Sequence, residues 1–552
     1  MTTTQENLEI QKLKQIYNKT VKIFGPPGTG KTYTLIEKVL KGHIKRGVNP
    51  NNIAFISFTN KAVNTAKDRT LAAFPQYTEK DFSRFKTLHK YCRRYFEEEI
   101  FDIKNCLIDF ALEEKFIKYS DNRLEDDNFV YKDWSLGIYD KSRNMMKDPV
   151  SVYKMESYKK DNIDVFQRKI STYEHYKLNG RERPLIDFTD MIERAINEVI
   201  FPPLDILILD EAQDFTPLQW SVIYKIVDNV KRIYLAGDDD QAIYKWNGSD
   251  PKYFTTYFPG RKVVLHKTRR FNQAIYDFSQ IVRRGILDSV EKDFETINKE
   301  QGYVKRYMSF MEIPFNQLDG TWYILGRVTK VVNELRMGAK AAGLYFEDSK
   351  ETKSFDQKQW NAIKSWTAIS KGKSIDKKNA ENMYRFIREI DNSNYRDEKF
   401  WLDQPDFTTY NFKELKEWCG LTLDDESQTK EWWWVLRRNF SSKQKIYFIR
   451  LLKRYGQEQL DKRPQIIIDT IHSVKGGEAD HVIVSAKNDY ASDFNRKNKQ
   501  DKIDELKVYY TGFTRAKKTL HLLSSDNQYN YPVGKDYLVY LQEKNDQDKN
   551  NR

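Results

Sequence analysis

Residues 25–32 carry the clearest chemical signal in the 552-residue chain. A phosphate-binding loop has the pattern G-x-x-x-x-G-K-[ST], and the chain matches it with Gly25-Pro26-Pro27-Gly28-Thr29-Gly30-Lys31-Thr32. Glycines let backbone N–H groups close around phosphate oxygens, the lysine supplies a positive charge, and the threonine hydroxyl can bind Mg²⁺. An apolar run precedes the loop and a helical pattern follows it, so we predict a strand, a phosphate loop and a helix that bind ATP.

Two adjacent acids follow a second apolar run, at residues 204–209. Asp210, at the expected tip of this strand, can hold Mg²⁺ through water opposite Thr32, whereas Glu211 can orient and deprotonate an attacking water. A phosphate loop combined with acids at a strand end is typical of an enzyme that hydrolyses ATP. We therefore predict that Lys31, Asp210 and Glu211 are catalytic and that Thr32 and Asp210 bind the metal.

A third apolar run, residues 232–237, leads into a segment that combines a nucleotide sensor with aromatic side chains. Gln241 is placed to sense the γ-phosphate, and Tyr244 and Trp246 follow it with rings that can stack on nucleobases. Nucleotide state and nucleic-acid contact would then share one segment, as a motor protein requires.

The charge and composition of the chain favour a nucleic-acid partner. The net charge is +13 and 14% of the residues are aromatic, and basic surface interleaved with aromatic rings is typical of single-stranded nucleic-acid binding. The three cysteines are too scattered for a zinc site or a disulfide framework. The N-terminus has no apolar signal core, and no run approaches the roughly 20 apolar residues of a membrane span. We expect a cytoplasmic, nucleoid-associated protein without a membrane partner.

Taken in order, the motifs resemble those of a superfamily 1 DNA helicase of the UvrD/Rep/PcrA type. The later motifs are weak one by one, and their order and the strands around them carry the resemblance. The matching segments are 25–32, 58–62, 210–214 and 237–246 in the first half of the chain, and 268–270, 325–327, 470–478 and 510–516 in the second.

The resemblance implies an α/β fold of two RecA-like P-loop motor domains with parallel sheets and a helical insertion in each. ATP would bind between the two motor domains, and DNA would run across their tops. The run 262–265 is expected to be a strand of the second domain. The expected boundaries are 1–90 and 186–259 for the first, ATP-binding motor domain, 91–185 for its helical insertion, 260–349 and 461–540 for the second motor domain, 350–460 for a reduced insertion, and 541–552 for a disordered tail.

Two arginines of the second domain, Arg270 and Arg515, match the family's arginines that reach the γ-phosphate. Arginines delivered from another domain stabilise transition-state charge only when the domains close. The implied catalytic set is Lys31, Asp210, Glu211, Gln241, Arg270 and Arg515. The implied nucleotide-binding set is Gln15, Gly25, Pro26, Pro27, Gly28, Thr29, Gly30, Lys31, Thr32, Tyr33, Arg269, Gly477 and Glu478. Gln11 is the alternative to Gln15 for reading adenine.

Two positions depart from the family pattern. The family has Arg just after the phosphate-loop threonine, here Thr32, and Tyr just before the arginine that corresponds to Arg270, and these side chains sandwich the adenine. This chain has Tyr33 and Arg269 at those positions. We hypothesise a reciprocal exchange that keeps one aromatic face and one guanidinium around the base, since either can stack on it. Asn247 stands where the family has another arginine, which puts one charged contact in doubt.

The resemblance further implies an ATP-dependent helicase or translocase that moves 3′ to 5′ on single-stranded DNA and unwinds duplexes at single-strand/double-strand junctions, as a monomer. Taken alone, His89 is more typical of a surface or capping histidine. The alternative is a nucleotide-gated DNA-binding switch, or an ATPase subunit of a repair or defence complex that does not unwind DNA by itself. The implied DNA contacts are Phe58, Thr59, Asn60, Thr87, His89, Tyr244, Trp246 and His472.

The reduced insertion is rich in tryptophan. Seven of the 11 tryptophans fall between residues 350 and 460. This composition favours a compact aromatic core over a surface that binds duplex DNA or a protein partner.

Overall fold

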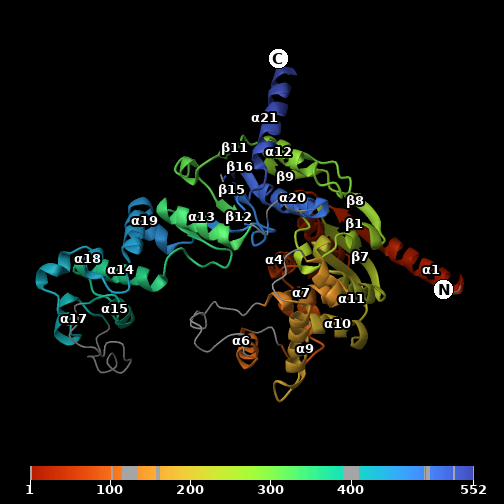
Figure 1. Ribbon diagram of the computed structural model, residues 1–552, viewed down its shortest axis with the longest axis horizontal. Coiled ribbons are helices and arrows are strands. Elements are labelled where there is room, and N and C mark those ends of the chain that lie inside the picture. Colours follow the sequence, from red (N-terminus) through yellow and green to blue (C-terminus); the bar gives the residue numbers. More distant parts are fainter. Residues whose placement is uncertain are drawn as a thin grey trace.

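The computed structural model describes residues 3–100, 104–114, 133–156, 162–388, 409–489, 492, 498–525 and 529–550. Two six-stranded parallel sheets form the body of the molecule, and two largely helical insertions extend from them (Figure 1). The predicted α/β class with two parallel sheets is therefore confirmed. Within the described residues, no helix combines the length and apolar character needed to cross a lipid bilayer.

The first sheet is buried on both faces, as expected for parallel strands with near-continuous apolar sequences. Along its central strand, Leu207 and Leu209 join one core cluster while Ile206 and Ile208 join the other. Its strand order is β3 (Phe85–Thr87), β2 (Ile53–Ser57), β6 (Leu204–Asp210), β7 (Val230–Gly237), β1 (Thr20–Phe24) and β8 (Arg261–Val264). Its main helices are α1 (Thr3–Lys19), the helical run α2 (Lys31–Tyr33), η1 (Thr34–Leu40) and α3 (Lys41–Lys45), then α4 (Asn60–Ala73), α5 (Leu88–Arg93), α10 (Phe188–Glu198) and α11 (Pro217–Val227).

Strand β8 corrects one expectation of the sequence analysis. The run 262–265 was assigned to the second domain, but β8 pairs in parallel with β1, with Val21 opposite Arg261 and Phe24 opposite Val264. The Leu265 N–H also donates to Phe24 O at 2.8 Å. An apolar strand sequence carries no information about which sheet edge it joins, so only the structure could assign β8 to the edge beside β1.

The second sheet repeats this two-faced burial. Val482 and Val484 of β15 join one cluster, and Ile483 joins the other. The order is β11 (Tyr303–Tyr307), β16 (Ala516–Leu523), β15 (Ala479–Ser485), β12 (Trp322–Gly326), β14 (Ile466–Thr470) and β13 (Phe346–Glu347). The helices here are α12 (Gln273–Arg283), α13 (Thr329–Ala341), α20 (Lys499–Phe513) and α21 (Val533–Asn550), and a small parallel ladder pairs β9 (Lys267–Asn272) with β10 (Glu295–Asn298).

The first insertion is tied to the first sheet by buried ion pairs. Arg143 bonds to Asp187 at 2.7 Å and Asp190 at 2.5 Å, and Lys177 reaches the same two acids at 2.9 and 2.7 Å. These pairs join the insertion helices to the start of α10. The described elements are β4 (Glu99–Ile100), α6 (Lys104–Glu113), α7 (Trp134–Asn144), α8 (Pro149–Met155), α9 (Ile163–Asn179) and β5 (Leu185–Ile186).

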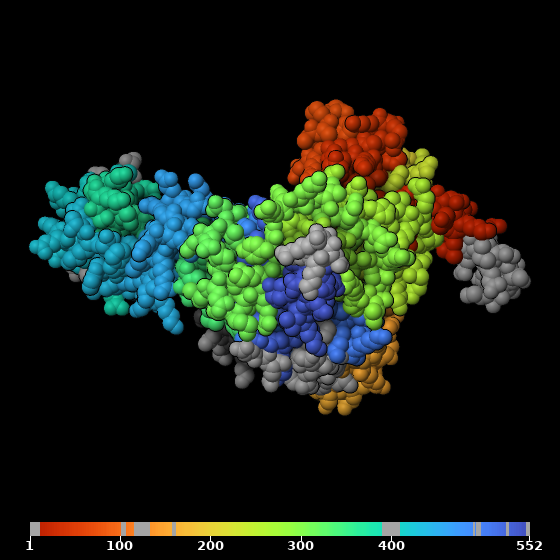
Figure 2. Space-filling model, turned by 90° about the horizontal axis from the view of Figure 1, so that it is seen from above, coloured from red at the N-terminus to blue at the C-terminus, as the bar shows by residue number. Residues whose placement is uncertain are grey.

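The second insertion forms a separate lobe with an aromatic core (Figures 1 and 2). Trp360 and Trp366 are fully buried and Trp432 is nearly so, whereas Trp418 and Trp434 are 50% and 63% exposed. Most of the described tryptophans therefore serve packing. The helices are α14 (Gln357–Ser370), α15 (Lys377–Tyr384), α17 (Phe412–Trp418), α18 (Trp432–Val435) and α19 (Ser442–Asp461).

Helix α21 differs from the expected disordered tail over residues 541–552. The helix continues through Asn550 and projects from the body (Figure 1). Its first half is held by packing, because buried Tyr540 contacts Phe278 of α12 with 5.9 Å between ring centroids. Arg284 then pairs with Glu543 at 2.5 Å. These anchors allow a polar sequence to continue as a helix.

Candidate nucleotide site and nucleic-acid interface

The phosphate loop leaves the carboxyl end of β1 and is closed by its own lysine. Gly28 and Gly30 have φ of +74° and +83°, a conformation that favours glycine. Lys31 Nζ donates to Gly25 O at 2.6 Å, and a Cβ on Gly25 would lie 2.2 Å from Lys31 Cγ. Buried Pro26 accepts a hydrogen bond through its carbonyl oxygen from Thr29 Oγ1 at 2.7 Å. The glycines are thus needed for both the turn and the approach of the lysine.

Asp210 lies where β6 ends and faces the loop. Its carboxylate Oδ2 accepts a hydrogen bond from Thr32 Oγ1 at 2.9 Å, and the residue is 1% exposed. Burial raises the pKa of Asp210, and the negative charge of Glu211 raises it further. A buried carboxylate beside a hydroxyl is a set of hard oxygen donors of the kind that Mg²⁺ prefers, and a cation would offset the burial of the charge. The two residues predicted to bind the metal therefore fit it.

Glu211 is held in place by Gln213, which the sequence analysis did not single out. Gln213 Nε2 donates to Glu211 Oε2 at 2.6 Å, and Gln213 Oε1 accepts from the Asp238 N–H at 3.0 Å. Burial alone would raise the pKa of Glu211, but the positive charges of Lys31 and Lys475 lower it below its usual value. Glu211 is therefore held as a carboxylate at neutral pH.

Arg515 reaches the first domain from the second. Its guanidinium donates to Gln241 Oε1, to Gly477 O at 3.1 Å and to Thr511 O at 2.9 Å. The residue is 2% exposed, and within the described part of the chain no carboxylate forms a salt bridge with it. Burial lowers the pKa of Arg515, with the charge of Arg270 as the second cause. A buried cation with only neutral acceptors favours the arrival of an anion.

Lys475 makes a second bridge between the domains that the sequence analysis did not assign. Its ammonium pairs with Asp214 and donates to Gln241 O at 2.7 Å. It also lies 5.0 Å from the centroid of the Tyr244 ring. The signal available in the sequence was a lysine inside segment 470–478, but its partners lie more than 200 residues away.

Strand β9 borders the phosphate loop, and its two predicted site arginines, Arg269 and Arg270, have different neighbours. Thr268 Oγ1 donates to Pro27 O at 2.7 Å, and the Arg269 N–H donates to Gly28 O at 3.2 Å. Arg270 bonds to Glu478 Oε2 at 2.8 Å, so two predicted site residues pair with each other.

The residues predicted to contact adenine all lie at the surface. Tyr33, just beyond the loop, is 52% exposed, and Arg269 is exposed beside Gly28. Gln15 and Gln11 are both exposed on α1, so the choice between them stays open. The hypothesis of a stacking exchange between Tyr33 and Arg269 remains a prediction.

Four of the predicted DNA contacts form an aromatic cluster at the domain boundary. Phe58 and Tyr244 stack with 4.6 Å between centroids, and Tyr244 contacts Trp246 at 6.2 Å and His472 at 6.1 Å. Trp246 is 62% exposed. His472 Nε2 lies 3.2 Å from Ile243 O, which can only accept, so Nε2 carries the proton. Burial lowers the pKa of His472 to about 3, so this ring is neutral at pH 7.

The remaining predicted contacts lie at helix starts. Thr59 and Thr87 are N-caps, accepting hydrogen bonds from Ala62 N at 3.3 Å and Lys90 N at 3.5 Å, a role that by itself accounts for a threonine. Asn60 is exposed. His89 makes an edge-to-face contact with Phe188 at 5.8 Å, and burial lowers its pKa to about 4. Phe188, 47% exposed at the start of α10, is an aromatic residue that the sequence analysis did not assign.

Comparison with known proteins shows similarity to DNA helicases. Residues 6–258 match the model of the UvrD/REP helicase N-terminal domain. The chain is 22% identical to the probable DNA helicase II homolog of Mycoplasma pneumoniae, over 95% of this chain and 84% of the relative. It is 26% identical to the probable DNA helicase II homolog of Mycoplasma capricolum over 53% of this chain and 43% of that relative. It is 23% identical to the ATP-dependent DNA helicase PcrA of Staphylococcus epidermidis over 67% of this chain and 52% of that relative. Residues 6–258 are therefore similar to the N-terminal domain of UvrD/REP helicases, and most of the chain is similar to a probable DNA helicase II homolog.

Proposed function

We propose that this chain is an ATP-dependent DNA helicase that moves 3′ to 5′ along single-stranded DNA and opens the duplex ahead of it. One observation carries the proposal. Buried Arg515, from the second domain, contacts Gln241 of the first, and among the described residues its hydrogen-bond acceptors are all neutral. A guanidinium delivered across two domains supports hydrolysis of ATP that depends on domain closure.

In the proposed reaction, ATP and water give ADP and phosphate. The backbone N–H groups of Gly28 and Gly30 and the ammonium of Lys31 bind the phosphates, and Glu211 accepts a proton at its carboxylate from the attacking water. Gln213 holds that carboxylate at 2.6 Å. Thr32 and Asp210 would hold Mg²⁺, which when bound supplies positive charge to the phosphate oxygens. Arg515 stabilises the charge that develops on the transferred group.

Hydrolysis is coupled to DNA through the segment 241–246. Gln241 lies at the nucleotide end, and Tyr244 and Trp246 offer rings on which bases can stack, each stack worth about 1–3 kcal/mol. Lys475 contacts this segment at two points, through Gln241 O at 2.7 Å and the ring of Tyr244. Movement of the second domain would therefore shift the aromatic contacts relative to His472.

The proposal extends to the setting in which the chain works. A net charge of +13 favours association with the DNA backbone. We place the protein on DNA in the cytoplasm, at the nucleoid, acting as a monomer at junctions between single-stranded and duplex DNA.

Strand separation is the direct test. Duplexes with a 3′ tail, a 5′ tail or no tail are incubated with ATP and Mg²⁺, and ATP turnover is measured in parallel with single-stranded DNA or RNA. We expect ATP turnover stimulated by DNA and unwinding of the 3′-tailed duplex. The Glu211→Gln variant is the control, since it should bind DNA without unwinding it.

Each other outcome has a defined meaning. Stimulation by DNA without unwinding would leave the chain as a nucleotide-gated switch or an ATPase subunit. Preference for the 5′ tail would reverse the proposed polarity. If neither nucleic acid stimulates turnover, the proposed function is wrong.

A further inference from the structure

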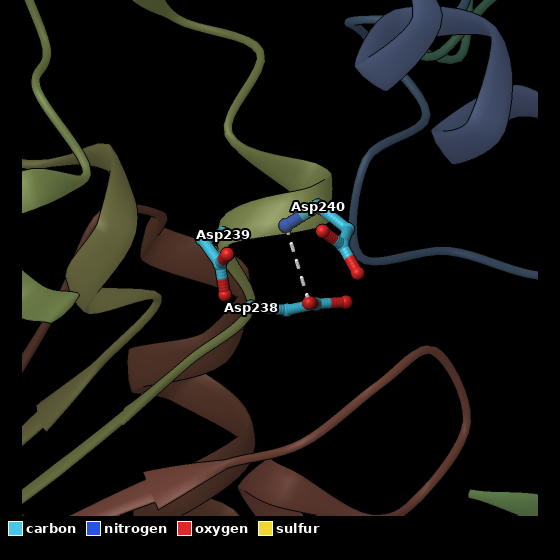
Figure 3. A group of neighbouring side chains, drawn as sticks. All are labelled: Asp238, Asp239 and Asp240. Carbon is cyan, nitrogen blue, oxygen red and sulfur yellow. Dashed lines mark hydrogen bonds between the residues drawn. The ribbon is translucent and has the colours of Figure 1, made fainter. Parts of the chain in front are cut away.

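Three consecutive aspartates, Asp238, Asp239 and Asp240, follow β7 and turn their side chains toward one region (Figure 3). One oxygen of each lies within 4.8 Å of the others, and all three residues are at most 1% exposed. Carboxylates this close repel one another strongly when buried, so a cation is needed among them.

The chain supplies that cation itself. Lys292, between α12 and β10, places Nζ 3.1 Å from Asp238 Oδ1 and 3.2 Å from Asp240 Oδ2, and also bonds to Asp239. Its side chain is fully buried. Burial alone would lower the pKa of Lys292, but the three carboxylates raise it above its usual value. The ammonium occupies the position that a metal ion would need, so the triad is not a metal site.

The same carboxylate that binds Lys292 also holds Gln241. Asp238 Oδ1 faces the ammonium, and Oδ2 accepts a hydrogen bond from Gln241 Nε2 at 2.5 Å. A carboxylate can only accept, so the amide nitrogen of Gln241 must face Asp238. The amide oxygen then faces the opposite way, where Arg515 donates to it.

We propose that Lys292 is a positioning residue for the γ-phosphate sensor: it fixes Asp238, which sets the amide orientation of Gln241. The inference rests on the proposed function. Both Lys292 and Arg515 come from segments C-terminal to β8, so the second domain holds Gln241 from two sides. Release of either contact would free the amide to rotate and weaken the link between nucleotide state and the segment 241–246.

The flanking contacts explain why Lys292 is specific for this task. Asp239 also accepts from the Val290 N–H at 2.7 Å, and Asp240 pairs with Arg283 Nε at 2.8 Å. These two acids therefore have partners of their own. Among the salt bridges of the described residues, Asp238 and Asp239 each have Lys292 as their only cationic partner, but of the two only Asp238 bonds to Gln241.

The test is a variant that removes Lys292 without changing the net charge of the cluster. Lys292→Met combined with Asp239→Asn removes one charge of each sign and leaves Asp238 without its ammonium. Asp239→Asn alone is the reference, and Arg284→Gln, which breaks an exposed ion pair in the same segment, is the control. We expect kcat for ATP to fall about 10- to 100-fold relative to Asp239→Asn, with KM within twofold.

A double-mutant cycle separates positioning from general damage. In a Gln241→Ala background the same change should have no further effect on kcat, because residues that act through one another are non-additive. Equal losses in both backgrounds, or an unchanged kcat, would overturn the inference. Thermal unfolding reports whether each variant is folded.

A second variant covers the case in which the first does not fold. Asp238→Asn conserves volume and leaves two acids facing Lys292 and Arg283, and it should reproduce the loss of kcat and the non-additivity with Gln241. A wild-type kcat in this variant would contradict the inference. If the wild-type chain itself does not hydrolyse ATP, the proposed function fails and the inference falls with it; if it does and the cycle is additive, only the inference fails.

Discussion

The two sheets share an architecture, but they differ in the turn that follows one inner strand of each, β1 and β12. After β1 the six residues 25–30 wrap into the phosphate loop before α2 begins. After β12 only residues 327 and 328 precede α13, and Arg327 bonds to Glu505 at 2.6 Å. A two-residue turn is too short for backbone N–H groups to surround a phosphate. The second sheet therefore contributes to the site through side chains that reach the first.

This difference assigns separate tasks to the two domains. The first domain holds the loop, the acids and Gln241, and the second contributes Arg515, Lys475 and Lys292. Each of these cations contacts an oxygen of the first domain, and the contact exists only while the domains are together. Half of the site is thus fixed by local sequence and half by domain closure.

The largest expected effect on ATP turnover comes from removing Arg515, the arginine that the second domain contributes to the site. Arg515→Ala should lower kcat for ATP by about 10³- to 10⁵-fold, because an arginine delivered in trans stabilises the transition-state charge by that amount. Steady-state ATPase kinetics with saturating single-stranded DNA measure it. Arg284→Gln, an exposed arginine of the same domain, should stay within twofold of wild type. A loss under tenfold would mean that the second sheet is not needed for chemistry.

The next effect concerns the acids of the first sheet. Glu211→Gln should lower kcat by about 10²- to 10⁴-fold while a fluorescent ATP analogue still binds, because the amide cannot accept the proton of water. Asp205→Asn, an acid near the other end of β6 that pairs with Lys231, is the matched control and should keep turnover. Wild-type hydrolysis by Glu211→Gln would remove this residue from the mechanism.

Substitution of Tyr33 and Arg269, the residues predicted to contact adenine, tests whether both domains also contribute to ATP binding. Tyr33→Ala and Arg269→Ala should each raise KM for ATP about 2- to 30-fold, as expected for loss of a stacking or cation–π contact of about 0.5–2 kcal/mol. Tyr257→Ala removes a tyrosine that is equally exposed, at 52%, and should leave KM unchanged. If both site variants keep the wild-type KM, the exchange hypothesis is wrong.

The smallest effect separates the sheets by their response to acid. Burial lowers the pKa of His521 in β16 to about 3, so the unfolded chain binds its proton first, and folding free energy is lost as pH falls from about 6.5. The loss should reach about 2 kcal/mol between pH 6.5 and 5. Lys22 in β1, whose pKa burial lowers to about 8, is charged throughout this range and contributes no slope.

Urea unfolding at the two pH values measures this difference. The shift of the unfolding midpoint with pH should be smaller in His521→Phe than in wild type, and unchanged in Lys22→Met. The same shift in wild type and His521→Phe would show that this histidine does not couple stability to pH.

Particular residues show how far the sequence alone could lead. The loop at 25–32 and the acid pair at 210–211 were found because their chemistry depends on spacing within a few residues. Lys292 and Gln213 were not found, because a lysine in a charged segment and a glutamine after two acids have no distinctive pattern. Strand β8 was assigned to the wrong sheet, since four apolar or basic residues give a strand but no partner.

The sequence by itself determined the resemblance to UvrD/Rep/PcrA helicases, the α/β class, the phosphate loop and the order of the motifs, because each rests on local patterns that can be recognised without knowledge of contacts. Only the tertiary structure decided which cations meet which oxygens across the two domains. Arg515 meets Gln241 over a separation of 274 residues, and Lys475 meets Asp214 over 261. Such pairings depend on how two separately buried sheets pack together, and no short-range pattern records that.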